Sequence, residues 1–213
     1  MRLRLVYSGP LVATQGAADR EPPRRAALKH EIRRCFHAQL RWHWQTNAFL
    51  SETEAYPSDY DLAPELGLHN GRMRLVDAVA SRHERWGYRF VPLVRRGWKV
   101  MCELDVLLLR HDPPGALVTA GDVDNRIKTL IDALTLPQQQ NQLTGNETPR
   151  EEETPFYCLL EDDVLVSRLN VETDRLLVPP RGTRSEHNQE VQAVVTATVR
   201  PYVATLFNLG FSA

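Results

Sequence analysis

The sequence predicts a single α+β domain in which a small mixed or antiparallel sheet packs against helices and carries loop insertions. Several segments alternate polar and apolar residues, as half-buried strands do, whereas two others repeat apolar residues at helical spacing. Strands come both before and after a central helix, an order typical of the α+β class. With 213 residues, 42% of them hydrophobic, the chain is long enough to bury one core.

The first part of the chain is expected to hold a strand followed by a long basic helix. Residues 2–13 alternate in polarity and predict the strand. Residues 24–44 show apolar residues near helical spacing without an interrupting proline, which predicts the helix. Residues 46–71 are polar and acidic and contain two prolines, so we expect a loop insertion there. Residues 72–86 favour a short helix. The charged side of the long helix is basic and comprises Arg24, Arg25, Lys29, Arg33, Arg34 and Arg41.

The middle of the chain changes from strand spacing to helical spacing. Residues 88–110 predict a hairpin that turns near residues 95–97. In its second strand, residues 98–110, one face is expected to carry Cys102, Leu104, Val106 and Leu108. The segment GDVDNRIKTLIDAL, residues 121–134, predicts a helix whose buried stripe consists of Ile127, Leu130, Ile131 and Leu134.

The last third is expected to return to strands after a long loop. Residues 138–156 are low in apolar content and contain two prolines, so they predict a long flexible loop. Residues 156–178 begin with an apolar run, carry an acidic cluster and continue as a strand. Residues 190–203 alternate and predict the final strand. We assign all of these elements to one domain, residues 1–213.

Composition excludes several classes of protein. No apolar run is long enough for a membrane helix, and residues 1–13 lack the apolar core of a secretory signal, so a soluble cytoplasmic protein is expected. The three cysteines, Cys35, Cys102 and Cys158, form no C-x-x-C pair, which argues against a disulfide framework or a zinc ribbon. The net charge is −1, but residues 1–110 hold 18 Lys and Arg against 12 Asp and Glu, and residues 111–213 hold 8 against 15. This asymmetry hints at an anionic partner such as nucleic acid.

Two acidic clusters are candidates for chemistry. Asp122 and Asp124 stand two positions apart at the expected start of a helix, where they could supply oxygen ligands to a hard cation such as Mg²⁺. They could equally cap the helix and complement its dipole, with Asp124 paired to Lys128 one turn later. The cluster of Glu161, Asp162 and Asp163 interrupts an apolar run and is explained either by a cation or by a solvated turn.

Other candidate sites have simpler explanations. Glu103 and Asp105 form another acidic pair, which the polar face of a half-exposed strand explains. Trp42, Trp44 and Trp98 alternate with basic residues and could stack on bases, although tryptophans more often lie in or beside a core. The sequence contains no zinc, phosphate-loop or serine-nucleophile motif.

Taken together, GDVDNRIKTLIDAL and the downstream LLEDDVLVSRLNVE resemble the RusA-like Holliday junction resolvases. The family pattern is a D-x-D-N-x-x-K helix start with a D-A-L ending, followed by a D-D pair that opens a strand. Those positions are Asp122, Asp124, Asn125 and Lys128, then residues 132–134, then Asp162 and Asp163. The resemblance spans roughly residues 98–200, including a closing hairpin at about 164–199, together with the first strand.

The resemblance implies a dimeric, Mg²⁺-dependent endonuclease, with Mn²⁺ as a possible substitute, that cuts four-way DNA junctions in recombination and repair. It implies that Asp122, Asp124 and Asp163 bind the metal, that Lys128 is the catalytic lysine, and that Asp162 is a weaker candidate beside Asp163. The expected partners are branched double-stranded DNA and a second copy of the chain, with no membrane. The expected DNA-backbone contacts are Arg24, Arg25, Lys29, Arg33, Arg34, Arg95, Arg96 and Lys99.

The chain departs from compact family members in its insertions, at about 46–71 and 138–156, and in its slightly acidic charge. Two other hypotheses therefore stay open. In one, the protein binds branched DNA without cutting it, and the acidic residues only cap a helix and form a turn. In the other, it is an interaction protein without a nucleic-acid partner.

Overall fold

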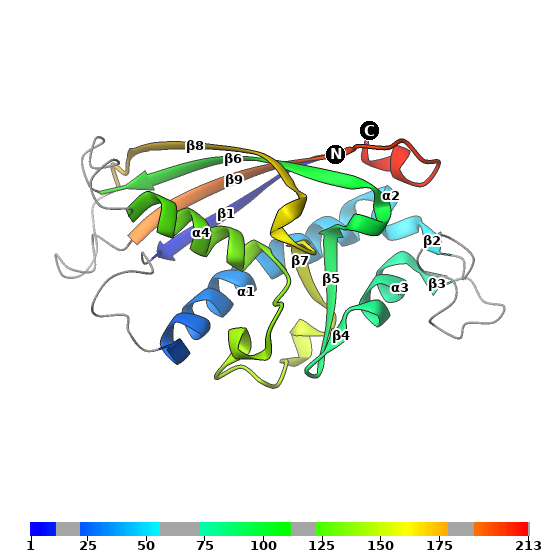
Figure 1. The fold of residues 1–213 in the computed structure, drawn as a ribbon, viewed down its shortest axis with the longest axis horizontal. Coiled ribbons are helices and arrows are strands. Elements are labelled where there is room, and N and C mark those ends of the chain that lie inside the picture. Colours follow the sequence, from blue (N-terminus) through cyan, green and yellow to red (C-terminus); the bar gives the residue numbers. More distant parts are fainter. Residues whose placement is uncertain (12–21, 56–72, 112–121, 179–189, 213) are drawn as a thin grey trace.

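The computed structural model describes residues 1–11, 22–55, 73–111, 122–178 and 190–212 (Figure 1), although the side chains of Pro22, Pro23 and Asp122 stay outside the description. It confirms the predicted α+β class, with both parallel and antiparallel strand pairs. In Figure 1 a four-stranded sheet forms one layer, and two long helices, α1 (Pro22–Thr46) and α4 (Asp122–Leu134), lie on one side of it. None of the helices in these ranges is long and apolar enough to cross a membrane.

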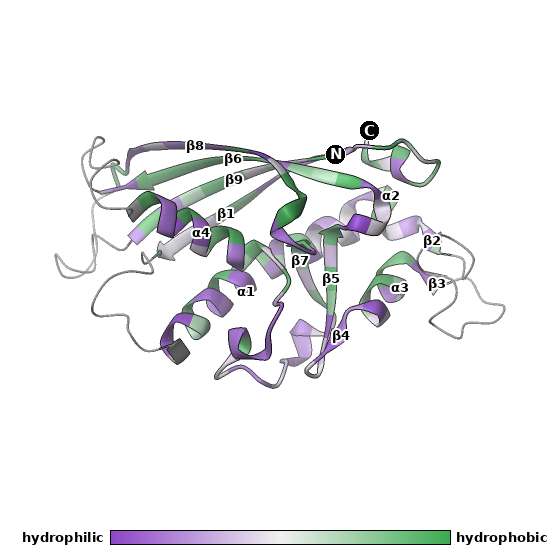
Figure 2. Cartoon of the chain, viewed as in Figure 1, coloured by the Kyte–Doolittle hydropathy of each residue, from purple (hydrophilic) through white to green (hydrophobic). Residues whose placement is uncertain are grey.

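The main sheet has the strand order β1-β9-β6-β8, formed by β1 (Arg2–Pro10), β9 (Glu190–Pro201), β6 (Val100–Arg110) and β8 (Val166–Arg175). β9 is antiparallel to both β1 and β6, whereas β8 is parallel to β6. Burial alternates along β6, and its predicted inner face is confirmed. Figure 2 shows that β8, the edge strand, is largely hydrophilic, in keeping with its mostly exposed residues.

Two strand pairings differ from those predicted. β5 (Tyr88–Val94) does not form a hairpin with β6; it joins a second sheet with β4 (Glu84–Arg85) and, in parallel, with β7 (Phe156–Leu160). The short 3-10 helix η3 (Arg96–Trp98) and the left-handed Lys99, at φ 55°, turn the chain from one sheet into the other. The predicted closing hairpin is also wrong, because β6 lies between β8 and β9.

The predicted long helix is confirmed as α1 and extends two residues beyond the prediction at each end. One side of α1 enters the main core through Ile32, Phe36, Leu40 and Trp44. Its Gln39 amide also closes the edge of β1: Gln39 Nε2 donates to the Val6 carbonyl at 2.7 Å, and the Val6 amide donates to Gln39 Oε1 at 2.8 Å. The side-chain amide of Gln39 thereby takes the place of a neighbouring strand at the backbone N–H and C=O of Val6.

The two predicted insertions have different outcomes. Most of the first, 56–71, falls outside the described residues; the flanking parts form the short helix α2 (Ala48–Glu52) and a two-stranded sheet of β2 (Glu54–Ala55) and β3 (Met73–Arg74). The short helix expected next is confirmed as α3 (Leu75–Arg82). The second insertion, predicted to be a long flexible loop, is instead folded against α1.

The folded insertion contains two 3-10 helices, η4 (Gln140–Leu143) and η5 (Glu151–Glu153). Leu143 is fully buried in a second hydrophobic cluster with aromatic residues of β5 and β7. The Tyr88 hydroxyl donates to the Asn146 carbonyl at 2.9 Å, and Glu153 forms an ion pair with Arg34 of α1. A few deeply buried side chains therefore fix a segment whose overall composition is polar.

Candidate functional site

The candidate site is built on α4, because its buried stripe fixes which residues face solvent. Ile127, Leu130 and Leu134 are buried as predicted, and Ile131 is partly buried. The opposite side of the helix leaves Asp124 and Lys128 exposed. Asp122 is the first residue of the helix, but its side chain falls outside the described part.

A third charged residue, Asp132, continues this side of α4. Asp124, Lys128 and Asp132 stand at successive i,i+4 positions, so they form one row along the helix surface. Lys29 of α1 forms an ion pair with the Asp132 carboxylate, and both side chains are about three-quarters buried. Arg33 of α1 donates from Nη2 to the Asp132 backbone carbonyl at 3.0 Å. Two basic residues of α1 thus hold the last turns of α4.

The second acidic cluster forms a turn between β7 and β8. Asp162 caps the 3-10 helix η6 (Asp163–Leu165), and its side chain accepts a hydrogen bond from the Val164 amide at 3.0 Å. Leu165 is buried and anchors the turn, whereas Asp163 is exposed. The Leu136 amide donates to the Leu160 carbonyl at 2.9 Å, which ties the chain after α4 to the end of β7. This contact brings the acidic turn to the C-terminal half of α4.

The pKa of Asp163 shows which acidic residues lie near its carboxyl group. Although Asp163 is exposed, the neighbouring chain partly desolvates its carboxyl and raises its pKa. A hydrogen bond with Asp162 and the charges of Asp162 and Asp132 raise that pKa further. A backbone hydrogen bond at Val164 acts in the opposite direction. Like charges therefore gather at this turn, an arrangement that a bound cation would relieve.

Among the described side chains, the structure does not bring the predicted metal-binding residues together. Asp163 lies near Asp132, and Asp124 stands eight residues before Asp132, about 12 Å along the helix axis. Among the described residues no group of three His, Cys, Asp or Glu side chains converges well enough to hold a metal ion. The donor chemistry, carboxylate oxygens, suits Mg²⁺. The side chain of Asp122 falls outside the described part of the structure, so its distance from the other carboxylates is not described.

Four of the predicted DNA contacts are side chains that the fold engages internally. Arg33 is 2% exposed, and burial lowers the pKa of its guanidinium. Arg95 is 4% exposed, with its guanidinium 5.0 Å from the ring centroid of Trp98. Lys29 is paired with Asp132, and Arg34 binds two glutamates. The other four remain accessible: Arg24, Arg96 and Lys99 are exposed, and Arg25 is partly exposed.

Most of the other candidate residues agree with their simpler explanations, and Trp42 is the exception. Glu103 and Asp105 lie on the outer face of β6, where Arg168 Nη2 approaches their carboxylates at 3.1 and 3.2 Å. Trp44 and Trp98 are buried, whereas Trp42 is 67% exposed on α1. All three cysteines are free thiols.

Sequence reasoning missed the role of Asp132. In the sequence, Asp132 stands out only as the first residue of the D-A-L ending, which assigns it no function. The signal was present, because Asp124, Lys128 and Asp132 repeat at intervals of four and must share one side of a helix. Its pairing with Lys29 could not be found this way, because the two residues lie 103 positions apart.

Comparisons of the chain with protein-family models, with curated proteins and with solved structures find no match.

Proposed function

We propose that the protein is a Mg²⁺-dependent endonuclease that cuts branched DNA, with the four-way junction as its expected substrate. The observation that carries the proposal is a row of charged residues on α4, with Asp124 and Lys128 exposed and Asp132 partly buried, and with the acidic turn of Asp162 and Asp163 beside its end. The D-x-D-N-x-x-K and D-D pattern, which resembles that of the RusA-like resolvases, supports the same function.

In this proposal the carboxylates of Asp122, Asp124 and Asp163 would hold one or two metal ions, as the sequence pattern implies. In the structure Asp163 lies beside Asp132, about 12 Å along the axis of α4 from Asp124. Bound by the three carboxylates, Mg²⁺ would supply an activated water and would neutralise charge on the leaving oxygen. Lys128 stands one helical turn from both Asp124 and Asp132, where its ammonium stabilises negative charge on the scissile phosphate. The buried stripe of α4 keeps these side chains on a rigid support.

DNA is held by cations that the fold leaves accessible. Arg24 and Arg25 lie at the start of α1, whereas Arg96 and Lys99 lie at the connection between the two sheets. Such contacts bind the backbone independently of sequence and weaken with salt. A homodimer would present two sites to a two-fold symmetric junction, which suits paired cleavage.

A cleavage assay on a synthetic four-way junction tests the function. We expect the wild type to cut in Mg²⁺ and not in EDTA, and Asp124→Asn, Asp163→Asn and Lys128→Gln each to lose at least about a hundredfold in rate. Asp174→Asn, an exposed substitution on β8, is the matched control and should keep the wild-type rate. Equal cleavage by wild type and the three site variants would show that the site is assigned wrongly.

A second candidate is a branched-DNA-binding protein of the same fold that does not cut. It is favoured by the engagement of Asp132 with Lys29 and by the lack of a three-ligand group among the described residues. Under this hypothesis the wild type shifts a four-way junction in a gel without cleaving it in either Mg²⁺ or Mn²⁺. Failure to bind any DNA at low salt would instead favour an interaction protein.

A further inference from the structure

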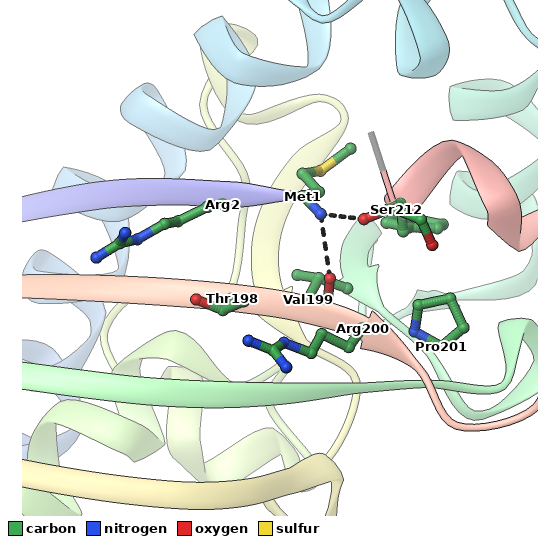
Figure 3. A pocket seen from close by; sticks show the side chains of 8 residues that line it. Met1, Arg2, Thr198, Val199, Arg200, Pro201 and Ser212 are labelled. Carbon is green, nitrogen blue, oxygen red and sulfur yellow. Dashed lines mark hydrogen bonds between the residues drawn. The ribbon is translucent and has the colours of Figure 1, made fainter.

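A pocket of about 430 Å³ opens where the beginning of β1 meets the end of β9 and the C-terminal 3-10 helix η7 (Asn208–Phe211) (Figure 3). Its size falls within the range of small-molecule sites, about 300–1,000 Å³. It is much larger than an inorganic anion needs. The residues lining it are Met1, Arg2, Thr198, Val199, Arg200, Pro201, Phe211 and Ser212.

The polar side of the pocket consists of two arginines and a hydroxyl. Arg2 of β1 pairs directly with Thr198 of β9, and Arg200 follows two positions later on the same face of β9. Val199 between them is fully buried, so Thr198 and Arg200 point to the opposite, outer face of the sheet. Figure 3 shows the side chains of Arg2 and Arg200 extending in the same direction on either side of the Thr198 hydroxyl.

The charge on this side is positive. Arg200 Nε lies 3.5 Å from Glu103 of β6, and Glu103 is shared with Arg168 of β8. Glu103 therefore orients Arg200, but one carboxylate cannot neutralise the charges of both Arg2 and Arg200. Across the ranges that the structure describes, the guanidinium of Arg2 has no carboxylate partner. Two guanidinium groups and a hydroxyl form a donor set suited to phosphate oxygens.

The other side of the pocket is apolar and fixed. Met1, Pro201 and Phe211 form this wall, and Phe211 belongs to the main core. The Met1 nitrogen donates to the Val199 carbonyl at 3.2 Å and also to the Phe211 carbonyl, which ties the pocket walls together (Figure 3). A ligand with a charged end and an apolar body matches these two sides.

We propose that this pocket binds a phosphate ester of mononucleotide size, with the phosphate on Arg2, Thr198 and Arg200 and the organic part against the apolar wall. The pocket is distant from the start of α4, where Asp122 and Asp124 lie. The Arg126 side chain of α4 donates to the Leu11 carbonyl, just beyond the end of β1 that is farthest from Met1. A nine-residue strand spans roughly 27 Å, so the start of α4 lies at the opposite end of the sheet.

The phosphate could belong to a free nucleotide or to the end of a nucleic-acid strand. Isothermal titration calorimetry of the full chain distinguishes them, with adenosine 5′-monophosphate, a 5′-phosphorylated trinucleotide, adenosine and inorganic phosphate as probes. We expect at least one of the first two to bind, and to bind at least about tenfold more tightly than adenosine or inorganic phosphate. Arg2→Gln and Arg200→Gln should each weaken that binding at least about tenfold, because each removes a charged hydrogen-bond donor.

Arg4→Gln is the matched control, since Arg4 lies on the same exposed face one pair further along β1 and does not line the pocket. It should leave binding within about twofold, and thermal unfolding should confirm that all three variants fold. The proposal is overturned if no probe binds at millimolar concentration, if adenosine or inorganic phosphate binds equally well, or if Arg4→Gln weakens binding as much as Arg2→Gln. None of these outcomes depends on nuclease activity, which the junction assay measures separately.

Discussion

The helix α1 forms ion pairs on two sides, and the two pairs differ in their surroundings. On one side Arg34 meets Glu153 of the folded insertion, where the glutamate side chain is 1% exposed. On the other side Lys29 meets Asp132 of α4, where both side chains keep about a quarter of their surface exposed. Both pairs join residues more than 100 positions apart. Only the second lies beside the proposed site.

The difference shows that burial, and not charge alone, decides how strongly a basic residue of α1 stabilises the fold. Burial by itself would raise the pKa of Glu153, but hydrogen bonds from Arg34 and from the Arg150 backbone outweigh burial and lower it. His37 strengthens the same side: its Nδ1 accepts from the Tyr157 amide at 2.9 Å, and its Nε2 lies 3.1 Å from the Glu152 carbonyl. The insertion is thereby an integral part of the fold, whereas the Lys29 pair is held more loosely.

The largest expected effect comes from breaking the buried pair. Glu153→Ala leaves the Arg34 guanidinium without its buried partner, so we expect a loss of about 3–5 kcal/mol in the free energy of unfolding. Glu31→Gln removes the other carboxylate bound to Arg34, but Glu31 is 61% exposed, so its loss should stay below about 1 kcal/mol. Urea denaturation measures both, and equal losses would contradict the distinction.

A hydrophobic substitution tests the insertion without changing charge. Leu143→Ala should lower the free energy of unfolding by about 2–3 kcal/mol, because it leaves a cavity in the second cluster. Leu177→Ala, at a side chain that is 83% exposed, should change it by less than about 0.5 kcal/mol. A Leu143→Ala variant as stable as wild type would mean that the segment is a dispensable loop after all.

Acid should destabilise the fold through two buried histidines, His30 on α1 and His83 directly after α3. Burial, and then the charge of Arg33, lowers the pKa of His30 to about 3; burial, and then Arg95, does the same for His83. Both histidines are neutral in the folded state, whereas the unfolded chain takes up protons below about pH 6.5. Stability is therefore full above that pH and falls as the pH drops from 6.5 toward 3.

Between pH 7.5 and pH 5.5 the expected loss is about 1 kcal/mol for each of these two histidines. His30→Leu should remove its share of the pH dependence, which urea denaturation at the two pH values measures. An unchanged difference between the two pH values in His30→Leu would show that His30 does not carry it.

The smallest expected effect belongs to the pair beside the site. Lys29→Gln should change the free energy of unfolding by about 1 kcal/mol or less, because water screens the partly exposed pair. Thermal unfolding at low and high salt checks this, with Lys99→Gln, at an exposed position away from α4, as the control. A loss as large as that in Glu153→Ala would make the two sides of α1 equivalent.

The sequence predicts local structure well here and non-local structure poorly. The α4 stripe and the alternation along β6 follow from the periods of the helix and the strand, which nearby residues determine. The pairing of β5 with β7 instead of β6 joins segments about 66 positions apart in the register, and no local pattern specifies it. The same limit applies to the site: exposure of Asp124 and Lys128 follows from the helix, whereas the capture of Lys29, Arg33 and Arg34 by distant acceptors does not.

Gln39 makes the two edges of the main sheet unequal. Its amide occupies both backbone groups of Val6, in the middle of β1, where a strand from another molecule would have to bond. At the opposite edge β8 has no further strand beside it in the described part of the chain. Sheets polymerise into fibres only when both edges accept a neighbour. By holding the backbone groups of Val6, Gln39 of α1 hinders a strand of another molecule from pairing with β1, so edge-to-edge growth of this sheet is favoured at β8 alone.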